Sequence, residues 1–233
     1  KIFVVLQNRF NDPIIELKKA IDKKLFGKLF LATIRLRWSR GASYYSQSKW
    51  RGTWELDGGA LMNQASHYVD LLDWLNGSIE HVHCFSSTLK RKIEVEDTAV
   101  VNFIFKSGAL CTLSVSDTIV GPWSYELTAG ENPAYPVTNQ SAYYIGGTKG
   151  SIQFPNLKHW YNKGERSWWK PMYHKDMNIR LSRFTLINQI NHLCDVVSGK
   201  AKPKVTGEDG LQSLKIFDAI IKSSKSGKKI SIK

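Results

Sequence analysis

The sequence has few cysteines and no long hydrophobic run. Its three cysteines, Cys84, Cys111 and Cys194, lie far apart, with no CxxC pair. An odd number of widely spaced cysteines predicts neither a disulfide framework nor a thiolate zinc site. The longest aliphatic and aromatic run, Ile2–Leu6, is far shorter than the roughly 20 residues of a membrane helix, and no signal-peptide pattern opens the chain. We therefore expect a soluble protein of the reducing cytoplasm.

Acidic residues are also scarce: 20 Asp and Glu face 33 Lys and Arg, which gives a net charge of +13. Basic chains bind nucleic acids, membranes or anionic metabolites. Here most cations are lysines in helical or terminal segments, without the arginines and aromatics of a nucleic-acid groove. A solvated basic surface, or attraction of an anionic small substrate, explains the charge better than nucleic-acid binding.

Hydrophobic residues make up 42% of the 233 residues, which is enough for one large domain, or for one domain and a remnant of another. Apolar alternation and turn residues predict strands at 2–6, 28–38, 80–89, 99–106, 109–117, 124–130 and in a second hairpin over 143–154. In the strand 28–38, Phe30, Ala32, Ile34 and Leu36 share one face. Helices are predicted from Asp12 to Gly27, over 183–199, and over 206–227 behind a Thr206/Asp209 capping box.

This order predicts an α+β fold with a large, open, mainly antiparallel (mixed) sheet and helices packed on one face. Such a sheet leaves its other face free for a partner.

The most informative stretch is RGTWELDGGALMNQASHYVDLLDWLNG, residues 51–77. At about 100° per residue, Asn63, His67 and Asp70 share one polar stripe of a helix that is apolar on the opposite side. One interpretation is a helix whose polar side is simply in water. The other is an active-site wall, because a His with a pKa near ~6.5 can take a proton from a sugar hydroxyl, and Gly58-Gly59 admits close backbone approach.

Three other features are weaker. The GGTKG segment lacks the spacing of a phosphate loop and is typical of a hairpin turn. His81 and His83 share a strand face, but no third metal ligand has suitable spacing, so we expect no metal. The aromatic and basic segment 156–183, with KHWYNKGERSWWKPMY, is either a loop over the core or a subunit contact, or a platform for a base or sugar.

Four segments together closely resemble the Gfo/Idh/MocA oxidoreductases: QNRFNDPIIELKKAI, IRLRWSRGASYYSQSKWRGTWELDGGALMNQASHYVDLLDWLNG, IEVEDTAVV and GTKGSI. The similarity runs from about Gln7 to Ser151 and is looser in the last two helices. Within the family it is greatest to the bacterial UDP-N-acetyl-D-glucosaminuronate 3-dehydrogenases of lipopolysaccharide and O-antigen synthesis.

The resemblance implies NAD-dependent oxidation of the C3 hydroxyl of a UDP-N-acetyl-hexosaminuronic acid to the 3-keto sugar. In some members 2-oxoglutarate re-oxidises the reduced cofactor. Family enzymes combine an N-terminal Rossmann domain with a C-terminal α+β domain whose sheet forms homodimers or homotetramers. The remaining alternatives are a non-catalytic oligomerisation module, and an oxidoreductase acting on another sugar or polyol.

This chain departs from the family because it shows neither a glycine-rich dinucleotide fingerprint nor the Glu-Lys-Pro motif that carries the catalytic lysine. We therefore expect residues 1–10 to be the last strand or linker of a Rossmann domain that is absent from the chain. Residues 11–233 would be the C-terminal substrate-binding and oligomerisation domain, inactive alone and lacking most of the NAD site.

The resemblance also assigns residues to roles. His67 matches the active-site histidine, a proton acceptor or relay. Asn63 stands where many relatives have aspartate; because an amide cannot act as a base, it would orient substrate or nicotinamide. Apart from the resemblance, we expect Asp70 of the polar stripe to be a structural partner. Gln64 would lie on the cofactor side. The residues predicted to contact the substrate are Arg51, Trp50, Asn8, Arg9 and Tyr44, with the arginines pairing to carboxylate or diphosphate oxygens.

Overall fold

The computed structural model describes residues 2–177 and 185–233. Within these ranges, nine strands form one sheet in the order β8-β7-β6-β5-β1-β4-β3-β2-β9. Their bounds are β1 Leu29–Arg37, β2 Ile79–Ser87, β3 Thr98–Phe105, β4 Leu110–Ser116, β5 Tyr143–Gly147, β6 Gly150–Phe154, β7 Lys158–Tyr161, β8 Tyr173–Asp176 and β9 Ile230–Ser231. The pair β1 and β4 is parallel, and the other neighbours are antiparallel. The predicted mixed α+β fold is confirmed.

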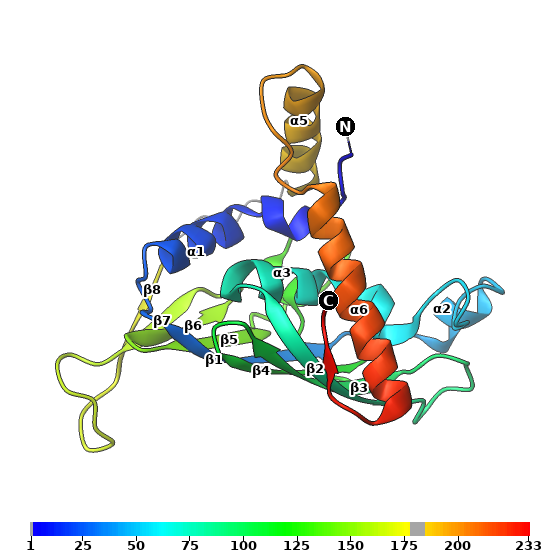
Figure 1. The fold of residues 1–233 in the computed structure, drawn as a ribbon, viewed down its shortest axis with the longest axis horizontal. Coiled ribbons are helices and arrows are strands. Elements are labelled where there is room, and N and C mark those ends of the chain that lie inside the picture. Colours follow the sequence, from blue (N-terminus) through cyan, green and yellow to red (C-terminus); the bar gives the residue numbers. More distant parts are fainter. Residues whose placement is uncertain (1, 178–184) are drawn as a thin grey trace.

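Helices cover one face of this sheet. The long ones are α1 Asp12–Asp22, α3 Ser66–Asn76, α5 Thr185–Val197 and α6 Gly207–Ser226; the short ones are η1 Gln7–Phe10, α2 Ala42–Ser46, η2 Ala60–Gln64 and α4 Tyr125–Ala129. Helices α1, α3 and α6 lie over the same side of the sheet, and α5 projects away from it (Figure 1). No helix in the described ranges covers the opposite side, which we name the open face. None of the described helices combines the length and apolar character needed to cross a membrane.

The core lies between the sheet and these helices. Ala32, Ile34 and Leu36 of β1 are buried at alternate positions, as the period-two pattern predicts. Phe30 is an exception: a register irregularity between Leu29 and Leu31 breaks the alternation, and Phe30 remains 49% exposed. The apolar side predicted for residues 60–76 is buried against the sheet.

Several local signals are confirmed. Ser107-Gly108 joins β3 to β4, and the GGTKG segment is the turn between β5 and β6. Helix α6 has the Thr206/Asp209 capping box and ends at Gly227. Helix α1 begins behind Asn11, but its regular part ends at Asp22 and a turn carries the chain on to Gly27.

Three expectations about elements were wrong. Residues 2–6 form no strand, because no neighbouring strand pairs with them; the 3-10 helix η1 follows. Residues 124–130 form helix α4, since the Ser124 side chain accepts the Leu127 N–H and caps it. Residues 158–176 do not form the loop over the core that was one alternative for segment 156–183: β7 and β8 form a hairpin that extends the sheet edge, with Trp168 and Trp169 exposed. Residues 178–184, including the first two of the helix predicted over 183–199, lie outside the described ranges.

Candidate active site

The turn before the predicted active-site helix depends on two glycines. Gly58 and Gly59 both have positive φ, 78° and 72°, a conformation that favours glycine. A Cβ on Gly59 would collide with the carboxylate of Glu96. That carboxylate accepts the Leu61 N–H at 2.8 Å, so it holds the first turn of the following helix in place.

The helix itself is not continuous. Residues 60–64 form the π-helical turn η2, closed by a hydrogen bond from the Ala65 N–H to the Ala60 carbonyl at 3.0 Å, and α3 begins at Ser66. Such wide turns often occur at functional sites. Asn63, Gln64 and His67, which flank this junction, all line the same cavity.

This cavity has a volume of about 630 Å³. It lies between η1, the segment after β1, the η2–α3 junction, the region around α4 and the start of α5, and it is lined by Gln7, Asn8, Trp38, Arg40, Asn63, Gln64, His67, Glu126, Glu131, Asn132, Pro133, Tyr135, Thr185, Leu186 and Ile187. Four lining residues each carry a buried polar atom without a hydrogen-bond partner: Asn8 Nδ2, Arg40 Nη1, Gln64 Oε1 and His67 Nδ1. Because buried polar atoms in proteins are nearly always paired, four orphans at one cavity indicate a ligand site.

His67 has the electrostatics of a neutral base. Burial lowers the pKa of its imidazole, and the nearby Asp70 only partly opposes this effect. The ring is therefore uncharged at neutral pH and can accept a proton.

Asn63 has both ends of its amide engaged. Its Oδ1 accepts a hydrogen bond from Arg40 Nη2, and its Nδ2 donates to Asp57 Oδ1 at 2.8 Å. Asp57 in turn accepts the Gly52 N–H at 2.7 Å. Asn63 thus joins the helix to the segment after β1 and to the 50–57 loop.

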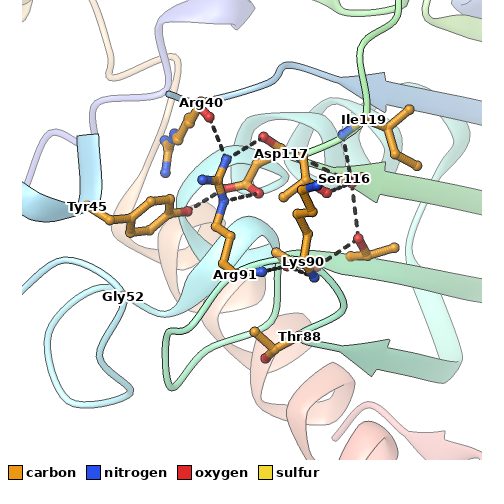
Figure 2. A network of polar contacts seen from close by, with 12 residues as sticks. Arg40, Tyr45, Gly52, Thr88, Lys90, Arg91, Ser116, Asp117 and Ile119 are labelled. Carbon is orange, nitrogen blue, oxygen red and sulfur yellow. Dashed lines mark hydrogen bonds and ion pairs between the residues drawn. The ribbon is translucent and has the colours of Figure 1, made fainter. Parts of the chain in front are cut away.

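Arg40 reaches the cavity from the segment after β1, and its backbone is clamped there. Its N–H donates to the Asp117 carbonyl at 2.8 Å, and its carbonyl accepts from Arg91 Nη2. Arg91 also pairs with the Asp117 carboxylate at 3.0 Å, which Tyr45 contacts through its hydroxyl. Figure 2 shows the Arg91 guanidinium between the Arg40 backbone and Asp117. This network fixes the loop that carries Arg40, Tyr44 and Tyr45.

The two predicted residues of η1 have different positions. Asn8 is buried and lines the cavity. Arg9 does not line it: Nε and Nη2 donate to Asp70, and Nη1 donates to Asp209 at 3.0 Å. With all three nitrogens engaged inside the protein, Arg9 joins η1, α3 and α6, and its contact with the substrate stays a prediction. Asp70, expected to be a structural partner, accepts the hydrogen bonds of Arg9.

Tyr44, Trp50 and Arg51 form a separate cluster outside the cavity lining. The Arg51 guanidinium lies 4.1 Å from the Tyr44 ring centroid and 5.3 Å from that of Trp50. It also donates to the Tyr44 carbonyl at 2.8 Å. The Arg40 guanidinium lies 4.1 Å from the same Tyr44 ring, so Arg40 connects this cluster to the cavity.

Sequence reasoning missed Arg40, Trp38 and the acidic part of the cavity wall. Glu126 accepts the Tyr68 hydroxyl and Glu131 accepts the Tyr125 hydroxyl, both at 2.6 Å. Burial raises the pKa of both carboxyl groups. Arg40 could have been found from its place just after an expected strand, where loop residues gather at a sheet edge. The two glutamates gave no such signal, because the sequence pattern around Glu126 predicts a strand.

The histidines weighed as metal ligands lie elsewhere. His81 and His83 belong to β2, beside a shallow pocket of the open face. In the described part of the chain, no group of three or more His, Cys, Asp and Glu side chains is arranged to hold a metal ion.

Comparison with known families matches residues 14–153 to the GFO/IDH/MocA C-terminal domain. The chain belongs to this family. A search of curated proteins finds no match.

Two solved structures show the same relationship at the level of sequence. The chain is 33% identical to the WlbA dehydrogenase of Chromobacterium violaceum, covering 99% of this chain and 62% of that one, with a TM-score of 0.77. The WlbA dehydrogenase of Bordetella pertussis is 32% identical over 100% of this chain and 63% of that one, also with a TM-score of 0.77. Both were crystallised with NADH and UDP-GlcNAcA. A levoglucosan dehydrogenase in complex with NADH, at 18% identity and a TM-score of 0.76, shares the fold. The chain thus spans less than two thirds of the length of the two WlbA enzymes.

Proposed function

We propose that this chain supplies the sugar-binding half of an NAD-dependent dehydrogenase that oxidises the C3 hydroxyl of a UDP-N-acetyl-hexosaminuronic acid. The observation that carries the proposal is the cavity in which His67 and three other buried, unpartnered polar groups converge. The similarity to two dehydrogenases crystallised with NADH and UDP-GlcNAcA supports the substrate class.

In this reaction the alcohol loses two hydrogens, one as a proton from oxygen and one as a hydride from carbon. His67 takes the hydroxyl proton, directly or by relay, since its imidazole is neutral and lines the cavity. Asn63 does not take the proton, because an amide is not a base and both of its ends are already held. Its role is to fix the wall beside His67.

The side-chain amides of the cavity wall are suited to bind the nicotinamide group of NAD. Gln64 presents an unpartnered acceptor and Asn8 an unpartnered donor, and a nicotinamide carboxamide has the complementary donor and acceptor. Gln64 cannot turn freely, because its Nε2 donates to the Trp38 carbonyl at 2.9 Å. When bound, NAD would supply the hydride acceptor, and most of its contacts would come from a nucleotide-binding domain.

We further propose that the protein is a homo-oligomer that associates through the open face. Apolar side chains from four neighbouring strands are exposed there: Leu31, Phe85, Val100 and Leu110. An exposed apolar patch of this kind marks an interaction surface. Synthesis of surface polysaccharide in the cytoplasm is the proposed setting.

Isotope transfer tests the reaction directly. The protein carrying this chain and its nucleotide-binding domain is given NAD and UDP-GlcNAcA deuterated at C3, and in parallel the sugar deuterated at C4. We expect deuterium in the reduced cofactor from the C3-labelled sugar alone. Label arriving from C4, or no reduction with either sugar, would refute the proposal.

A further inference from the structure

Arg40 is the one arginine or lysine among the described residues that lines the cavity. Its Nη1 is buried and has no hydrogen-bond partner, while its Nη2 donates to a neutral amide, that of Asn63. Among the described residues, no carboxylate forms an ion pair with its guanidinium. Arg40 is half-buried, and a guanidinium with one buried, unpartnered nitrogen and no carboxylate partner is well suited to bind an anion.

The other two arginines considered for this role lie outside the cavity lining. The Arg9 guanidinium is surrounded by Asp70 and Asp209, and that of Arg51 binds the Tyr44 carbonyl and the Gln47 side chain outside the cavity. The cavity wall also carries two carboxyl groups, those of Glu126 and Glu131. A carboxyl group offers an anion no positive charge to pair with, so Arg40 is the residue of the wall suited to bind an anionic group.

The identity of Asn63 preserves this arrangement. An aspartate at position 63 would place its charge against Arg40 and neutralise it, and would also face the Asp57 carboxylate that Asn63 now binds. The neutral amide holds Arg40 in position from one side and Asp57 from the other without using the positive charge. Because Asn63 accepts from Nη2, the other terminal nitrogen of Arg40, Nη1, remains available to bind a ligand.

We propose that Arg40, held by Asn63, binds the carboxylate of the hexuronic acid and makes the site selective for a sugar acid over the corresponding neutral sugar. This inference rests on the proposed function, since it names the group within that substrate that the cavity recognises. Arg40 contacts Asn63, which lies one helical turn from His67, so it lies near the position of the sugar ring that reacts. The carboxylate is attached to that ring, whereas the diphosphate lies beyond the anomeric carbon.

Calorimetry of the full-length protein saturated with NADH tests the proposal, because NADH permits binding without turnover. The ligands are UDP-GlcNAcA and UDP-GlcNAc, which carries a hydroxymethyl group in place of the carboxylate. We expect the wild-type protein to prefer the acid and Arg40→Gln to lose roughly 10- to 100-fold in affinity for the acid alone, the size of a charge-assisted hydrogen bond. Arg166→Gln, which removes the same charge from the exposed β7–β8 hairpin, should leave both affinities unchanged.

Two further variants separate a lost contact from a lost fold. Asn63→Asp keeps Arg40 but neutralises it, so it should also lower affinity for the acid and spare the neutral sugar. Arg40→Lys keeps the charge without the two-pronged geometry, and should retain part of the preference.

The outcomes are distinguishable. A preference for the acid that survives in both Arg40→Gln and Asn63→Asp overturns the assignment of Arg40 but leaves the proposed function standing. An equal loss of both ligands in Arg40→Gln would place the diphosphate at Arg40 and overturn the carboxylate assignment. If the wild-type protein binds neither UDP-sugar, the proposed function fails, and this inference with it.

Discussion

Glu96 shows how one buried residue holds the site in shape. It is 3% exposed, accepts the Leu61 N–H and lies against Gly59, where no other residue type would fit without displacing it. Burial raises the pKa of its carboxyl group to about 7, from an ordinary value of 4.5.

This shift predicts a pH-dependent stability. Between the two pKa values the folded protein holds a proton that the unfolded chain has lost, so stability falls as pH rises from about 4.5 to about 7 and stays low above that. The full effect is on the order of 3 kcal/mol. Glu96→Gln keeps an oxygen for the Leu61 N–H but cannot ionise, so it should be more stable than wild type at pH 8 and similar at acidic pH.

Urea unfolding at several pH values measures this difference. Glu94→Gln makes the same chemical change two residues away, at an exposed position, and should follow the wild-type pH profile. Parallel profiles for wild type and Glu96→Gln would show that Glu96 does not carry the linkage.

At the scale of single residues, sequence reasoning placed His67 and Asn63 on one helical stripe, and both line the cavity. It did not find Arg40, whose importance comes from a contact 23 positions along the chain and from a clamp by Asp117 and Arg91. It also gave no sign of the carboxylates around Arg9, since a sequence shows a charge but not its partners in the fold.

Among the elements, the sheet was largely predictable. Period-two patterns and glycine turns located the β3–β4 and β5–β6 hairpins because these signals are local. Errors arose where a local pattern depends on its surroundings. Residues 2–6 are apolar, as a strand would be, but lack a neighbouring strand, and the π-helical turn at 60–64 interrupts a continuous apolar pattern.

The open face of the sheet leads to a prediction about assembly. Leu31 of β1 and Leu110 of β4 are paired in register and about half exposed. If copies of the chain associate through this face, the double substitution Leu31→Glu, Leu110→Glu buries two charges in the interface and should yield single chains.

Light scattering measures the mass of the assembly that wild type and each variant form in solution. Leu89→Glu, on an exposed loop outside the sheet, is the matched control and should keep the oligomer of the wild type. A wild-type chain that is already monomeric, or a double variant of unchanged mass, would contradict association through the open face.

In the whole molecule, the fold separates two surfaces. Helices α1, α3 and α6 cover one face of the sheet, while the other face remains open (Figure 1). The strands β1 and β4 are parallel, so their carboxyl ends lie side by side. The segment after β1, with Trp38 and Arg40, therefore meets Asp117, which follows β4. The η2–α3 junction and η1 complete the cavity beside these strand ends, so the cavity is built from segments that are far apart in sequence.

The central claim is that His67 is the proton acceptor of a sugar dehydrogenase. The most direct measurement is the rate of NADH formation from UDP-GlcNAcA by the full-length protein carrying His67→Asn, compared with wild type and with His83→Asn on the open face. Removal of a general base lowers the rate by roughly 10²- to 10⁴-fold. We predict a loss in that range for His67→Asn with an unchanged melting temperature, and no loss for His83→Asn. Wild-type turnover in a folded His67→Asn variant would contradict the account.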